Sequence, residues 1–187
     1  MIDKNILPLH LKSAREMLPN VPQDMFDMFF VTLVEDVGWP FKSKYDSAWD
    51  TEWQRVFNPF SLNQIADFEW VKKEFVFDRG LFWDGSIGDV EAVVQNCFGL
   101  LPRWGNYDFD RCQKSTLYHL EKLTTSGRGL DKPIVMAPIP GAGKFKILDG
   151  NHRMAAAWLC KLKGMSIAFD AWVAEPAGLK STNGGVC

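Results

Sequence analysis

The chain has 187 residues, 47% of them hydrophobic, which is enough to bury a core without disulfides or a structural metal. Its 21 basic and 23 acidic side chains give a net charge of -2, which excludes the broad positive field of proteins that bind nucleic acid mainly through phosphates. The four cysteines form no C-x-x-C pair and no secretion signal opens the sequence, so we expect reduced thiols and a cytoplasmic protein.

Residues 1–104 are predicted to form a mainly helical extension, which we expect to select the substrate. Apolar spacing predicts a helix over residues 24–37. Its most apolar run, Met25–Val34, is well short of the ~20 residues that cross a bilayer, so we expect no membrane span. Six of the eight tryptophans lie within this extension. We interpret them as core residues, with stacking on bases or on a substrate ring as the alternative.

The second half of this extension is predicted to contain short elements of both kinds. Residues 61–71 have the spacing of an amphipathic helix, with Ser61 as its N-cap. A strand is predicted over residues 75–77, and a helix over residues 89–98 with Asp89 as its N-cap.

Residues 105–178 are more regular and are predicted to form an α+β module, followed by a flexible tail over residues 179–187. The predicted elements are a helix over 110–123, a strand over 132–137, a turn over 140–143, a strand over 144–148, a helix over 151–162 and a strand over 166–173. A strand that leads through a glycine turn into a helix is typical of an anion site, because the N–H groups of the first helical turn are free.

The segment Asp149–Arg153 reads Asp-Gly-Asn-His-Arg and stands between an apolar strand and an alanine-rich helix. Gly150 allows the backbone to approach a ligand closely, and Arg153 is suited to a bidentate contact with a phosphate. His152 can exchange a proton at neutral pH, and Asp149 is suited to binding Mg²⁺ or to acting as a base. The structural alternative makes Asp149 an N-cap and Arg153 its surface partner.

Two other patterns suggest a ligand site but fail on their spacing. Gly141–Lys144 resembles part of a P-loop, yet the first glycine of that motif falls on Pro138 and Phe145 replaces the Ser/Thr, so we predict a hairpin turn. The three histidines show no zinc-ligand spacing, and His119 is interpreted as a helix residue near the core.

The turn and its surroundings resemble the ParB/sulfiredoxin-like superfamily, whose members carry a D/G-G-x-H/R-R-x-x-A turn after a strand. The likeness covers about a third of the chain and follows the order of Leu117–Leu123, Gly129–Val135, Ile147–Ala157 and the strand that ends near Val173. It implies a small mixed sheet with helices that holds a phosphate group at the turn.

The branches of this superfamily differ in their chemistry. Sulfiredoxins carry a reactive cysteine where this chain has Asn151, so we expect no sulfinic acid reduction. The free-serine kinases carry D-G-H-H-R, which differs from this turn only at Asn151. ParB partition proteins continue into a DNA-binding domain, which we do not expect here because the sequence ends shortly after its last strand. The resemblance also implies phosphate contacts from the preceding helix, where the candidates are Arg111, Lys114, Ser115 and Thr116 and a solvated helix face is the alternative.

The sequence therefore predicts a nucleotide-dependent phosphotransferase or NTP hydrolase that uses ATP or another nucleotide with Mg²⁺. Asp149 and His152 are the predicted catalytic residues, and Asp149 is the predicted Mg²⁺ ligand. His152 is also predicted to contact the nucleotide. The other predicted nucleotide contacts are Gly150, Asn151, Arg153, Lys114, Ser115 and Thr116. One alternative is a DNA-binding or nuclease-like ParB-family protein that grips backbone phosphates, and the acceptor of a transferred phosphate could then be DNA or a modified base. Another alternative is a regulatory module that binds a nucleotide without turnover.

Overall fold

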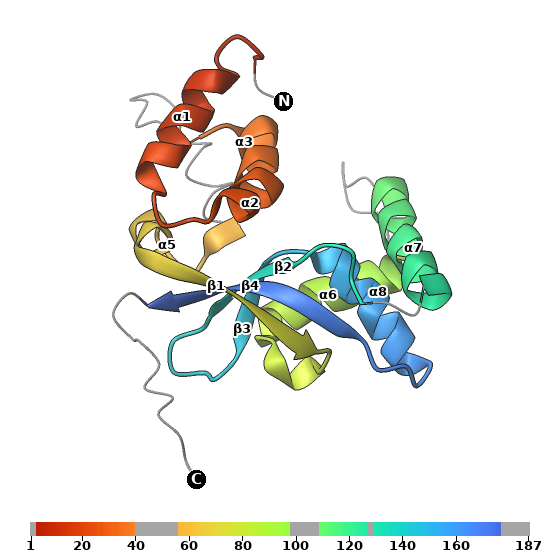
Figure 1. The fold of residues 1–187 in the computed structure, drawn as a ribbon. Helices are drawn as coiled ribbons and strands as arrows, with labels where there is room; N and C mark the ends of the chain where they lie inside the picture. The colour runs from red at the N-terminus through yellow and green to blue at the C-terminus, as the bar shows by residue number, and fades with distance from the viewer. Residues whose placement is uncertain (1–2, 40–55, 98–108, 127–128, 177–187) are drawn as a thin grey trace. The chain divides into compact units, whose positions relative to one another are not determined.

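The computed structural model describes residues 3–39, 56–97, 109–126 and 129–176 (Figure 1). The chain divides into two compact units, one made of residues 1–71 and 174–187 and the other of residues 72–173. Among the residues that the structure describes, no helix has the length and apolar character that a membrane span requires. The predicted tail over residues 179–187 lies outside the described residues.

The described helices of the first unit are short, and the π-helical segment among them packs its phenylalanine rings against one another. These helices are α1 (Leu7–Met17), α2 (Gln23–Met25), a π-helical segment (Phe26–Phe30), α3 (Val31–Val37) and α5 (Leu62–Asp67). The predicted helix over residues 24–37 is confirmed, with one π-helical stretch inside it. Its apolar face is buried, as Phe26, Phe29 and Phe30 are each at most 6% exposed.

Helix α5 begins as predicted and ends earlier than predicted. Ser61 is its N-cap and forms a capping box, in which Ser61 Oγ accepts from the Gln64 N–H and Gln64 Oε1 accepts from the Ser61 N–H. The prediction of helix up to Val71 was wrong, because β1 (Phe68–Val76) starts immediately after Asp67. Aromatic and β-branched residues favour a strand, and β1 lies next to β4 in the sheet, which supplies its hydrogen bonds.

The sheet has four strands in the order β1-β4-β2-β3, so the chain has an α+β fold. Strand β2 (Ile134–Pro138) is antiparallel to β3 (Phe145–Asp149) and parallel to β4 (Ala168–Pro176). The hairpin predicted between the second and third strands is confirmed, and the Ile139 N–H donates to the Lys144 carbonyl at 2.8 Å. Because Val135 pairs with Asp149, the end of β3 lies beside the beginning of β2.

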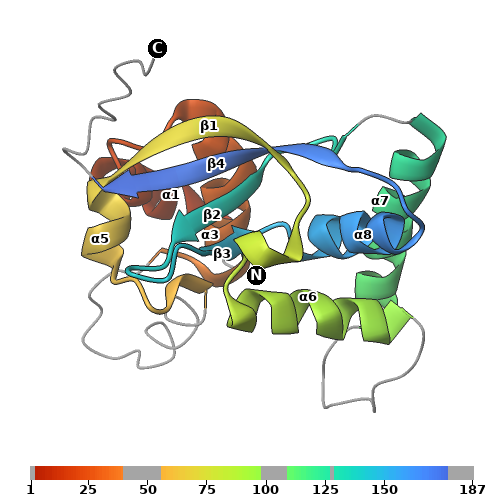
Figure 2. The same cartoon turned by 90° about the horizontal axis from the view of Figure 1, so that it is seen from below.

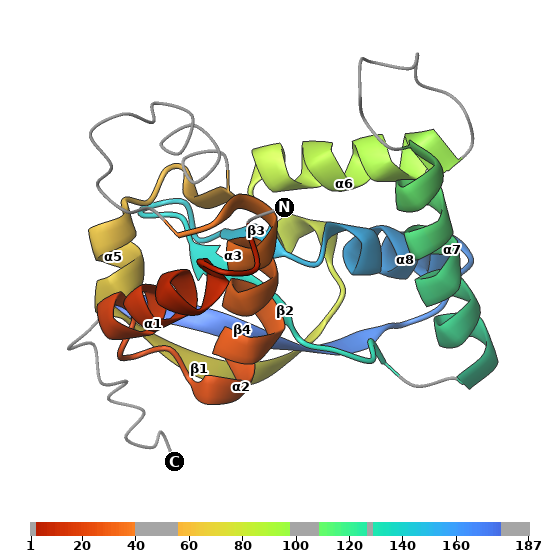
Figure 3. The same ribbon diagram turned by 90° about the horizontal axis from the view of Figure 1, so that it is seen from above.

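Three helices of the second unit, α6 (Asp84–Cys97), α7 (Phe109–Ser126) and α8 (Asn151–Leu162), pack against one another (Figures 2 and 3). Helix α8 contributes small buried residues, Ala155, Ala156 and Ala157, which allow the other two helices to approach closely. Together with part of β1, α6 belongs to this compact unit, although the sequence places both within the extension.

Helix α6 starts five residues before the predicted N-cap Asp89, so that prediction was wrong. The glycines near its beginning disfavour a helix by their intrinsic propensity. Tertiary contacts outweigh this cost, because Ser86 Oγ accepts a hydrogen bond from the Ile147 N–H at 3.0 Å and Ile87 is buried in the core.

Candidate functional site

The segment Asp149–Arg153 joins β3 to α8, and the helix begins at Asn151 as predicted. Gly150 is the N-cap residue and has a φ of 110°, in the region that favours glycine. A Cβ at this position would lie 2.6 Å from Cγ2 of Ile134 on β2. Both the backbone conformation and the close packing against β2 therefore require glycine here.

The first turn of α8 offers hydrogen-bond donors without partners inside the helix. The first helical bond runs from the Met154 N–H to the Gly150 carbonyl, and no side chain caps the helix. The N–H groups of Asn151, His152 and Arg153 therefore have no acceptor within α8. Because these groups stand at the positive end of the helix dipole, this turn favours an anion.

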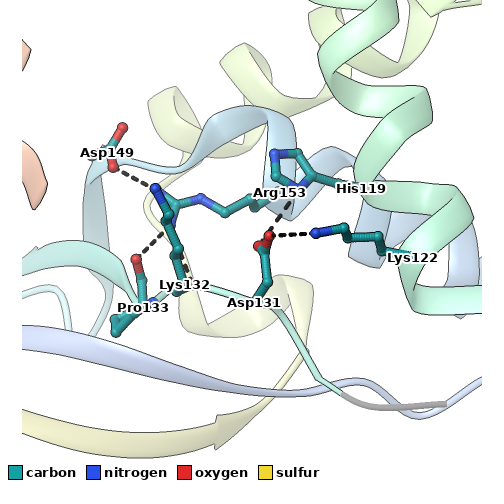
Figure 4. Close-up of polar contacts among 7 residues, drawn as sticks. All are labelled: His119, Lys122, Asp131, Lys132, Pro133, Asp149 and Arg153. Carbon is teal, nitrogen blue, oxygen red and sulfur yellow. Dashed lines mark hydrogen bonds and ion pairs between the residues drawn. The ribbon is translucent and has the colours of Figure 1, made fainter. Parts of the chain in front are cut away.

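Arg153 is 7% exposed, and its guanidinium is held by the protein itself. It donates to the carbonyls of Lys132 and Pro133, at 3.2 and 2.6 Å, and to the carboxylate of Asp149 (Figure 4). These contacts fix the turn to the segment before β2 and compensate the charge of Asp149. The structural alternative expected Asp149 to be the N-cap of the helix and Arg153 to be its partner at the surface. The two residues do form an ion pair, but Arg153 is buried and the N-cap is Gly150. The predicted contact between Arg153 and a phosphate stays a prediction.

His152 is held by a residue of α7, since its Nδ1 lies 3.1 Å from Oγ1 of the fully buried Thr116. Burial lowers the pKa of His152. His119, Arg111 and Arg153 lower it further, while Asp149 acts in the opposite direction. The imidazole is therefore neutral at pH 7, with one ring nitrogen as donor and the other as acceptor.

The candidates on α7 separate onto two faces of that helix. Thr116 points toward α8 and reaches the turn through His152. Lys114 and Ser115 instead line an open recess of about 530 Å³, together with Asp110, Arg111 and Tyr118. The separation follows from the helical repeat, in which adjacent residues point in different directions.

Asp149 and Asn151 are the remaining candidates at the turn. Oδ2 of Asp149 accepts from Arg153, and the side chain is 39% exposed. The described residues contain no group of three or more His, Cys, Asp or Glu side chains suited to a metal ion. Mg²⁺ often binds through one or two carboxylates plus the phosphates of a nucleotide, and the expected binding of Mg²⁺ at Asp149 stays a prediction. Oδ1 of Asn151 is buried and has no hydrogen-bond partner in the described part of the chain.

A polar cluster beside the turn was not predicted from the sequence. His119 Nδ1 lies 3.7 Å from Oδ1 of Asp131, and Lys122 Nζ lies 3.5 Å from Oδ2 of the same carboxylate (Figure 4). The prediction that His119 lies near the core is confirmed, since its side chain is 17% exposed, but it also lines a recess. The spacing of His119 and Lys122 on one helix face was the available signal, and the partner Asp131 was not apparent because it belongs to another segment.

The site thus combines the N–H groups that have no acceptor within α8, the neutral His152 and the paired Asp149 and Arg153. Comparison of the chain with protein-family models, curated proteins and solved structures finds no match.

Proposed function

We propose that the chain binds a nucleotide by its phosphate groups at the N-terminus of α8 and transfers or releases a phosphoryl group there. The observation that carries this proposal is the first turn of α8, where Gly150 brings the backbone close and three N–H groups lack helical acceptors. The resemblance of Asp149–Arg153 to the turn of the ParB/sulfiredoxin-like superfamily supports the same assignment, and membership of that superfamily is part of the proposal.

The phosphate is held mainly by backbone N–H groups in this proposal. Arg153 acts indirectly, because its contact with Asp149 compensates the negative charge of this carboxylate, which would otherwise repel an anion at the turn. The positive charge of Arg111 acts on His152 and therefore also favours an anion at this place. The site resembles an oxyanion hole in that its donors are fixed before the ligand arrives.

His152 is the proposed proton-transfer group. Its neutral imidazole is oriented by Thr116 and stands in the first turn of α8, where the phosphate binds. Asp149 is the carboxylate that would hold Mg²⁺ together with the phosphates, and the ion would supply charge compensation during phosphoryl transfer.

The test combines binding and turnover measurements with ATP and Mg²⁺. Wild-type protein is expected to bind ATP in calorimetry and to release or transfer label from γ-labelled ATP. The variant His152→Gln is expected to lose turnover by about 100-fold or more, which is typical for removal of a general acid or base. Lys144→Gln is the matched control. Lys144 also follows a glycine turn, but its ammonium group forms an ion pair with Asp84 at the surface, away from the proposed site.

Each possible outcome tests a different part of the proposal. Full turnover by His152→Gln would show that the imidazole transfers no proton, and full turnover by Asp149→Ala would exclude that carboxylate from the reaction. Binding of ATP by the wild type without turnover would support a regulatory module. Absence of ATP binding at millimolar concentration would contradict the proposed function as a whole.

A further inference from the structure

A second recess of about 440 Å³ lies between the C-terminal half of α7 and the segment before β2. Its polar lining consists of His119, Lys122, Thr125 and Asp131, and its apolar lining includes Leu123 and Leu130. This volume falls within the range of sites for small ligands. The proposed nucleotide contacts do not use the recess, since none of its lining residues belongs to the turn or to α8.

The recess and the turn are structurally connected. Asp131 is followed directly by Lys132 and Pro133, whose carbonyls both accept hydrogen bonds from Arg153 (Figure 4). His119 also lies close enough to affect the pKa of His152. A molecule in the recess would therefore be a neighbour of a phosphate bound at the first turn of α8.

The charges around His119 favour an anionic ligand. The cationic side chains that act on it are Lys122, Lys132 and Arg153, whereas Asp131 is the carboxylate that acts on it directly. Arg153 is in turn paired with Asp149, so the surroundings hold three positive and two negative charges. An excess of positive charge in a small recess attracts a carboxylate or a phosphate group.

The histidine has the properties of a ligand-contacting group. Burial lowers the pKa of His119, with Asp131 opposing this effect and the three cations adding to it, so the ring is neutral at pH 7. Nδ1 of the ring lies 3.7 Å from Oδ1 of Asp131. Lys122 stands over the ring of Tyr118, at 4.6 Å from its centroid, and is thereby held near Asp131 at the recess.

We infer that this recess is a second ligand site, which takes a small molecule bearing a carboxylate or phosphate group, and that His119 and Lys122 contact this molecule. The inference rests on the proposed function, in which the molecule is the acceptor of the phosphoryl group. The volume is suited to an acceptor of the size of a metabolite.

The three histidines of the chain provide a direct test by nuclear magnetic resonance of their ring C–H signals. His152 reports on the turn, His119 reports on the recess, and His10 is an internal control because its Nδ1 accepts a buried hydrogen bond from the Trp39 N–H. The signals are assigned with single His→Gln variants. The protein is first saturated with Mg²⁺ and a non-hydrolysable ATP analogue, and is then titrated separately with glycerate, inorganic phosphate and the neutral control glycerol.

The analogue is expected to move the signals of His152, and both anions are then expected to move those of His119 with saturation. Glycerol should move neither, and His10 should not respond to any of the four compounds. The variant Lys122→Gln is expected to weaken anion binding by about tenfold, which corresponds to about 1.4 kcal/mol. Glu121→Gln is the matched control, because Glu121 is an exposed residue of α7 that does not line the recess.

The inference is overturned if neither anion moves the His119 signals, if glycerol moves them equally, or if Lys122→Gln binds the anions as tightly as the wild type. It is also overturned if the anions move the His119 signals only in the absence of the analogue, since the recess would then be part of the nucleotide site. A failure of the analogue to move His152 contradicts the proposed function instead. In that case, saturable movement of His119 by the anions without the analogue would still support the recess as an anion site.

Discussion

Two glycine segments at opposite ends of β3 look alike in sequence and differ in structure. Gly141–Lys144 precedes the strand, and Asp149–Arg153 follows it. Each contains glycine with positive φ followed by a cationic side chain. The first segment is a hairpin turn whose Lys144 pairs with Asp84 at the surface, 2.7 Å away, whereas Arg153 in the second is buried.

The element that follows the glycine makes the difference. After Gly143 the chain enters a strand, and the hairpin closes with a backbone bond from Ile139 to Lys144. After Gly150 the chain enters α8, whose first turn leaves N–H groups for a ligand. Glycine and a cation alone therefore do not define a phosphate site, and the following helix is the decisive feature.

The largest expected effect on stability comes from Arg153, with Lys144 as the comparison. Arg153→Met should lower the free energy of unfolding by about 3–5 kcal/mol, because it leaves Asp149 and two carbonyls without their buried partner. Lys144→Met should have a much smaller effect, since its ion pair is at the surface. Urea unfolding of both variants measures the difference. Equal losses in the free energy of unfolding would show that the buried contacts of Arg153 do not stabilise the fold more than a surface ion pair does.

A smaller effect is expected when alanine replaces the glycines. Gly141→Ala should cost about 1–2 kcal/mol, because its φ of 72° is unfavourable but its Cβ would enter open space. Gly150→Ala should cost about 1–3 kcal/mol more, because its Cβ would overlap Ile134. Thermal unfolding of the two variants compares them directly, and a smaller cost at Gly150 would contradict the close packing of the turn against β2.

The smallest expected effect is a pH dependence to which His152 at the turn contributes, together with His10 and His119, whose pKa values burial also lowers. Burial lowers the pKa of His152 in the folded protein, so the unfolded chain binds more protons at acidic pH. Stability should therefore fall as the pH drops below the ordinary histidine value of about 6.5. His152→Gln should show a shallower loss between about pH 7.5 and 5.5, and Lys144→Met should keep the wild-type slope. An unchanged slope in His152→Gln would contradict the burial of this imidazole.

The sequence predicted the local features of this comparison well. The start of α8 at Asn151 and the hairpin at Gly141–Lys144 follow from neighbouring residues, and both are confirmed. The end of α5 and the start of α6 were wrong, because packing and strand pairing outweighed local propensity.

The sequence predicted which residues belong to the candidate site, but it did not predict most of their contacts. Thr116 was expected near the turn and lies there through His152. The burial of Arg153 depends on carbonyls 20 residues earlier in the chain, and the contact of His119 with Asp131 joins α7 to another segment. Such long-range partners leave no periodic pattern in a single sequence, so the sequence alone did not reveal them.

The backbone amide signals at the two glycine segments test the central claim most directly. On addition of ATP and Mg²⁺ to wild-type protein, the amide resonances of Gly150, Asn151 and His152 should show large, saturable shifts. Those of Gly141 and Gly143 should stay unchanged and act as the control. Shifts confined to the hairpin, or no shift at the first turn of α8 with millimolar ATP, would contradict a phosphate site at this helix.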